Sequence, residues 1–223
     1  MTSPTASEQH APMSYTMFVV VVAALMGMNP LAIDIMLPAF GLITSHYDLS
    51  NPNAVHTVIT FYLLGFGLGQ LLVGTFADSF GRKPILLVGV ALYTLAGLGC
   101  ALAPNFEALL AARFVCGLAS AAPRVVATAM VRDCYDGRTM ARVMALAMTF
   151  FMAMPLFAPL LGQIIVMVAP WQWIFGFVVV YGAVLFWVCF SALPETIRPE
   201  FRRPIAFTAM AEATRSVLGS RQT

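Results

Sequence analysis

The stretch that decides the fold is residues 54–103, which reads AVHTVITFYLLGFGLGQLLVGTF (54–76), ADSFGRK (77–83) and PILLVGVALYTLAGLGCALA (84–103). The first and third pieces contain no Asp, Glu, Lys or Arg. Each is long enough to cross the hydrocarbon core of a bilayer, which takes about 20 apolar residues. Because the apolar runs are continuous rather than alternating, they indicate two membrane helices joined by a polar turn, and not barrel strands.

The same pattern recurs along the chain and predicts an all-α membrane protein with six transmembrane helices. The expected spans are residues 15–43, 54–76, 84–103, 107–131, 141–168 and 171–193. Together they form a six-helix bundle over residues 15–193, preceded by a cytoplasmic tail at 1–14. Residues 194–223 are expected to be a cytoplasmic central loop or tail of a truncated chain. Within it, residues 205–218 are amphipathic and either lie along the membrane surface or form an ordinary solvated tail.

Composition supports the membrane interpretation and narrows the function. Hydrophobic residues make up 60% of the chain and charged residues 10%, whereas soluble domains carry about 25% charged residues. The net charge of +2 gives no reason to expect a nucleic-acid partner. Neither the cysteines nor the histidines have the spacing of a metal site, and neither HExxH nor GxSxG occurs, so we expect no metal, no catalytic residues and no enzyme. These residues are Cys100, Cys116, Cys134, Cys189, His10, His46 and His56.

The basic residues predict the orientation in the membrane. Ten of the twelve Lys and Arg side chains lie after the second span, after the fourth span or in the tail. Short cytoplasmic loops carry the excess of Lys and Arg. Both termini are therefore expected on the cytoplasmic side of the inner membrane.

Three charged residues lie at membrane depth: Asp34, Arg113 and Arg124. Each costs about 2.5–3.5 kcal/mol to insert and is therefore a functional candidate. Asp34 and Arg113 lie at similar depths, so we expect them to face one another across a cavity. Asp34 is then either a reversible proton site or half of a static ion pair with Arg113. Arg124 follows Arg113 by eleven residues on the same helix face and either lines the cavity or orders nearby carbonyl groups.

The turn after the second span contains Gly74, Asp78, Gly81, Arg82 and Lys83. A carboxylate at a helix end, a tight glycine turn and two cations predict a charged latch at the cytoplasmic surface. A simple basic hairpin turn is the alternative, but it accounts only for Arg82 and Lys83.

Small residues and prolines predict where helices pack closely or bend. Residues 65–69 and 117–122 are rich in glycine and alanine, which is typical of close helix packing. The fifth span contains Pro155, Pro159 and Gly162, and two prolines one turn apart favour a hinge.

Several of these motifs resemble the major facilitator superfamily. The turn resembles the family's loop motif, although Phe76 and Ser79 stand where Leu and Arg are usual. The segment Arg113–Ala119 resembles the fourth-helix motif, and Ala158–Gln163 resembles the fifth-helix antiporter motif with two glycines replaced. Other segments are similar to the bicyclomycin-resistance (Bcr/CflA) type of drug:proton antiporter: Ile33–Pro38, Ala122–Val126, Val131–Asp133 and Leu193–Thr196.

The resemblance implies a secondary transporter that exports small amphipathic compounds by alternating access. It implies a proton gradient as the energy source, no cofactor, roles for Asp34 and Arg113 in proton coupling, and a role for Asp78 in holding the outward-open state. Family members have twelve helices in two halves, and this chain corresponds to the N-terminal half. We therefore expect it to need a C-terminal six-helix half within the bilayer. A non-transporting membrane subunit or fragment is the alternative, and a membrane-embedded enzyme is less favoured.

Overall fold

The computed structural model describes residues 13–193 and residue 195. The expected amphipathic stretch at 205–218, and most of both tails, lie outside the described residues. Within the described range, six segments are helical, long and apolar enough to span a membrane.

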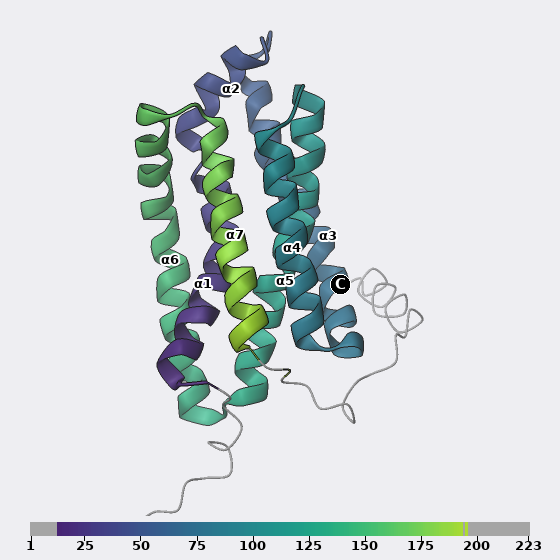
Figure 1. Cartoon of the computed structure of the whole chain (residues 1–223), viewed down its shortest axis with the longest axis vertical. Helices are drawn as coiled ribbons and strands as arrows, with labels where there is room; N and C mark the ends of the chain where they lie inside the picture. Colours follow the sequence, from purple (N-terminus) through teal and green to yellow (C-terminus); the bar gives the residue numbers. More distant parts are fainter. Residues whose placement is uncertain (1–12, 194, 196–223) are drawn as a thin grey trace, which may run out of the picture.

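The first span is made of three pieces and the second of two, whereas the others are single helices. In chain order the elements are α1 (Tyr15–Asp34), η2 (Leu37–Ala39), α2 (Phe40–His46), η3 (Pro52–His56), α3 (Thr57–Phe80), α4 (Arg82–Ala101), α5 (Phe106–Cys134), α6 (Gly137–Val168) and α7 (Gln172–Ala192). The long helices run roughly parallel to the long axis of the molecule (Figure 1).

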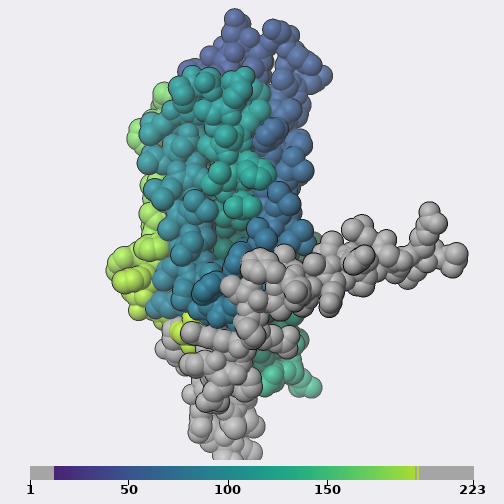
Figure 2. All heavy atoms as spheres, turned by 90° about the vertical axis from the view of Figure 1, so that its right-hand side faces the viewer, coloured from purple at the N-terminus to yellow at the C-terminus, as the bar shows by residue number. Residues whose placement is uncertain are grey.

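The bundle places α1 and α5 in contact with one another at its centre. Helix α3 packs along α5, α6 packs along α1, and α4 and α7 pack against each other (Figure 1). Figure 2 shows α3, α4 and α5 forming one continuous face of the bundle. We call the end that carries the α3–α4 and α5–α6 turns the basic end, because Arg82, Lys83, Arg132 and Arg138 lie there.

The first span is broken where the sequence pattern predicts one continuous helix. Pro38 has no N–H to donate to the Asp34 carbonyl. The Ala39 N–H donates to the Met36 carbonyl (2.9 Å) instead of to Ile35. The carbonyl groups of Asp34 and Ile35 thus lack the usual helical hydrogen bond, in the middle of a span.

Gly162 of α6 packs directly against this break. A Cβ at residue 162 would overlap the Ile35 carbonyl oxygen. The absence of a side chain therefore lets α6 approach the broken segment. Helix α6 itself is continuous through Pro155 and Pro159.

Glycines also bring α3 and α5 into backbone contact. A Cβ at Gly65 would overlap the Phe114 carbonyl, and a Cβ at Gly117 would overlap the Tyr62 carbonyl. Close approach of this kind replaces the hydrophobic driving force that helices lack in lipid. It also fixes the position of Tyr62 beside α5.

Two glycines, Gly117 at the contact between the helices and Gly67 away from it, give a direct test of this packing. We expect Gly117→Ala to destabilise the bundle by about 1–3 kcal/mol, because the methyl group forces the helices apart. Gly67→Ala is the control, since nothing lies within 4 Å of a Cβ at that position. Thermal unfolding of the purified protein in detergent would measure both. Equal unfolding temperatures for the two variants would contradict the close-packing account.

Candidate functional site

Arg113 of α5 is fully buried in the core of the bundle. Its Nη2 donates a hydrogen bond to the Ala32 carbonyl of α1 (3.1 Å). Its guanidinium carbon lies 4.4 Å from the ring centre of Tyr62 in α3 and 5.8 Å from that of Phe175 in α7. One side chain therefore contacts three other helices.

The charge of Arg113 is stabilised without a carboxylate partner. Within the described residues its Nε and Nη1 are buried and make no hydrogen bond. Aromatic faces attract a cation most strongly when it is removed from water, so the rings of Tyr62 and Phe175 take the place of a counter-ion.

Asp34 is the last residue of α1, two positions after Ala32, and is partly exposed. In the described part of the chain it forms no ion pair with Arg113. The static ion pair that the sequence allowed is thus absent from this structure, and Arg113 joins α5 to α1 through the Ala32 carbonyl. Asp34 and Arg113 are nevertheless attached to the same short segment of α1.

Arg124 lies further along α5 and is only partly buried. Its guanidinium carbon lies 4.2 Å from the ring centre of Phe151 in α6. Its Nη1 is buried and has no hydrogen-bond partner among the described residues. The sequence predicted that both arginines share a helix face, but they contact different neighbours.

The charged turn at the basic end is organised by Arg82. Its side chain forms an ion pair with Asp78 at the end of α3, and its Nε lies 3.2 Å from Oδ2 of Asp133 in α5. Gly81 permits this geometry because its φ of +108° is unfavourable for other residues. The turn therefore joins α3, α4 and α5.

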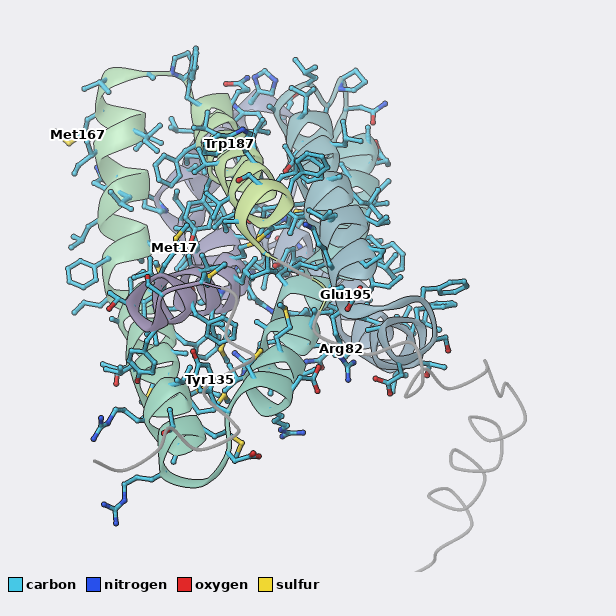
Figure 3. All side chains as sticks on the ribbon, turned by 60° about the horizontal axis from the view of Figure 1, so that its bottom comes forward. Met17, Arg82, Tyr135, Met167, Trp187 and Glu195 are labelled. Atoms are coloured by element: carbon cyan, nitrogen blue, oxygen red, sulfur yellow. The ribbon has the colours of Figure 1, made fainter. Side chains whose placement is uncertain are left out.

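At the same end, Glu195, just beyond α7, caps the start of α4, and Lys83 at the start of α4 caps the end of α7. The Glu195 carboxylate accepts hydrogen bonds from the Arg82 N–H (2.9 Å) and the Lys83 N–H (3.3 Å) at the start of α4. In return, Nζ of Lys83 donates to the Phe190 carbonyl in the last turn of α7 (2.9 Å). Figure 3 shows Arg82 and Glu195 close together at this end. Each charge lies at the helix end that its sign favours.

Sequence reasoning missed most of these partners. Asp133 and Glu195 were part of family-like segments but had no assigned role, and their distance from the turn in the sequence hid the contacts. The stacking rings of Tyr62, Phe151 and Phe175 are indistinguishable from lipid-facing aromatics in the sequence. Gly74, which the sequence analysis assigned to the charged turn, makes no close contact there: nothing in the described structure lies within 4 Å of the position that its Cβ would occupy.

The opposite end of the bundle carries aromatic residues and a hydrogen bond between the segments that follow α2 and α4. The Tyr47 hydroxyl donates to the Ala103 carbonyl (2.9 Å), and the Tyr47 ring packs against Trp171. Burial, together with the Cys100 thiol, raises the pKa of Tyr47. Aromatic residues of this kind are enriched where a membrane meets water. In the part of the chain that the structure describes, no group of three His, Cys, Asp or Glu residues is placed to hold a metal ion.

Replacing Arg82 by lysine tests the turn. Lysine keeps the charge but lacks the planar fork that reaches two carboxylates. We expect Arg82→Lys to lower the free energy of unfolding by about 0.5–1 kcal/mol, since both pairs are partly exposed. Chemical unfolding of the purified protein measures the change. The neighbouring exposed Arg132→Lys is the matched control, and an equal effect in both variants would argue against a specific role for Arg82.

Comparison with known proteins agrees with this architecture. The family model "Major Facilitator Superfamily" matches residues 15–221. A "Bicyclomycin resistance protein homolog" of Haemophilus influenzae is 34% identical over 194 residues, which cover 87% of this chain and 48% of that protein. "Multidrug resistance protein MdtL" of Shigella dysenteriae is 33% identical over 201 residues, with coverages of 90% and 50%. The chain thus spans about half the length of these relatives.

Solved structures share the fold. The human organic anion transporter MFSD10 has a TM-score of 0.69 at 21% identity, covering 88% of this chain and 52% of that one. A D-xylose-proton symporter has a TM-score of 0.68 at 14% identity, covering 91% and 52%. The expected fold class, six transmembrane helices forming half of this fold, is confirmed. The family consists of transporters and not of enzymes, which agrees with the expectation from the sequence. The chain belongs to the major facilitator superfamily.

Proposed function

We propose that this chain forms one half of a proton-driven exporter of small amphipathic compounds, which works by alternating access. The observation that carries the proposal is the placement of Asp34. A partly exposed carboxylate, for which the described residues supply no counter-ion, lies at a break in a membrane helix, on the segment that Arg113 holds. An intramembrane acid is a candidate functional residue by default, and proton transfer is one of the roles that such acids perform.

Asp34 binds a proton while the transporter is open to the outer side and releases the proton when the transporter opens to the cytoplasm. Arg113 holds the adjacent segment through Ala32 and supplies a nearby positive charge. Proton binding at Asp34 therefore alters the electrostatic field in which a substrate binds. The proton gradient is the energy source, and no cofactor is required.

The names of the relatives support export of drugs. They refer to bicyclomycin resistance and to multidrug resistance. Apolar, aromatic surfaces suit amphipathic compounds, although lipid-facing helices have a similar composition. We place the chain in the inner membrane with both termini in the cytoplasm, because the basic end then faces the cytoplasm.

A second six-helix half completes the transporter. The curated relatives are about twice as long as this chain. Gly74 leaves an open position on α3 where another helix can approach closely. In this arrangement the Gly74, Asp78, Gly81, Arg82 and Lys83 turn acts as a latch between conformations.

The fifth transmembrane helix supplies the hinge of the proposed cycle. Pro155 and Pro159 each remove one hydrogen bond from α6, and Gly162 allows movement against Ile35 without a side-chain collision.

Asp34→Asn tests the proton site. We expect this variant to abolish proton-driven efflux of ethidium in cells that express the complete two-half transporter, because asparagine cannot carry a proton between the two sides. Asp48→Asn is the matched control, since Asp48 is exposed on the outer loop, and should leave efflux unchanged. Full efflux by Asp34→Asn would rule out the proposed proton site.

The chain without a second half should fail to pump ethidium, whichever residue occupies position 34. Efflux by the monomeric chain alone would contradict the need for a second half. The role of Asp34 is tested separately, by the comparison of Asp34→Asn with Asp48→Asn.

A further inference from the structure

Arg124 is a cation within the membrane-spanning bundle whose charge is not compensated. Among the described residues its guanidinium makes no hydrogen bond and no ion pair, and Nη1 is buried from solvent. In the described part of the chain its aromatic contact is the ring of Phe151. Because Nη1 is removed from water without an acceptor in the described part of the chain, this side chain can bind a negatively charged ligand group.

The position of Arg124 differs from that of Arg113. Arg113 is fully enclosed, donates to a carbonyl and stacks on two rings. Arg124 is partly exposed and contacts a single ring. The first arrangement holds helices together, whereas the second leaves N–H groups available to a molecule that enters between α5 and α6.

Helices α5 and α6 make few contacts with one another, and α1 lies between their upper parts in Figure 1. A planar anion can accept N–H hydrogen bonds from Arg124, and an aromatic substituent of the same molecule can pack against the Phe151 ring, which already contacts this arginine.

We propose that Arg124 and Phe151 form a subsite that selects aromatic substrates carrying an anionic group, in preference to permanent cations. This rests on the proposed function, since it assigns a substrate class to the proposed exporter. At membrane depth the described charges are Asp34, Arg113 and Arg124, which leaves an excess of positive charge. That excess favours an anion over a cation.

Two dyes with the same xanthene ring system test the subsite: fluorescein, which is anionic, and rhodamine 6G, which is cationic. Binding to the purified complete transporter in nanodiscs is measured by fluorescence anisotropy. We expect the wild-type protein to bind fluorescein more tightly than rhodamine 6G. Arg124→Gln should weaken fluorescein binding by about tenfold, as expected for loss of one charge-assisted hydrogen bond, and should leave rhodamine 6G binding unchanged or slightly stronger, because a repelling positive charge is lost.

Further variants separate recognition from folding. Arg124→Lys should retain part of the fluorescein affinity because the charge remains, and Phe151→Leu should lose part of it because the ring is removed. Arg138→Gln, an exposed arginine at the basic end, is the control and should have no effect. An equal loss of both dyes in Arg124→Gln would overturn the proposal and assign Arg124 to structure or to contact with the second half. Unchanged fluorescein binding in Arg124→Gln, or no preference for fluorescein in the wild type, would also overturn it.

The same protein distinguishes this subsite from the proposed function. Fluorescein binding that depends on Arg124, without proton-driven export, would support the subsite and contradict the exporter. Proton-driven export that depends on Asp34, with no effect of Arg124→Gln on either dye, would support the exporter and contradict the subsite.

Discussion

The structure depends on the burial of one guanidinium group in a membrane bundle. Arg113 has no carboxylate partner among the residues that the structure describes, so its charge must be stabilised by the Ala32 carbonyl and the ring faces of Tyr62 and Phe175. These groups come from α1, α3 and α7. The four helices therefore have to meet at one depth, and this requirement fixes how the centre of the bundle is packed.

The packing at the centre of the bundle depends on two glycine contacts and one proline. Gly117 allows the backbone of α3 to approach α5, which positions Tyr62. Pro38 breaks the first span just after Asp34, and Gly162 lets α6 pack against the Ile35 carbonyl at that break. The irregular backbone is tolerated at this depth because protein surrounds it. The candidate proton site thus lies where the first span is least regular.

Local features of the sequence predicted the spans and the charged positions, because a bilayer requires long apolar helices and penalises every buried charge. The break after Asp34 was missed, although Pro38 was its signal, because the apolar run continues through it. The partners of the charges were also missed. Arg82 pairs with Asp133 in another helix, and Glu195 caps α4 from beyond α7; only the fold brings them together. Ring stacking on Arg113 and Arg124 has no sequence signal that separates it from lipid contact.

The most direct test of the central claim is to measure proton release when the cation ethidium binds to the purified complete transporter, with a pH-sensitive dye in weakly buffered solution. If Asp34 carries the coupled proton, substrate binding releases protons from the wild-type protein, and this release disappears in Asp34→Asn. Proton release of the same size from both proteins would contradict the account, because the proton would then come from a group other than Asp34.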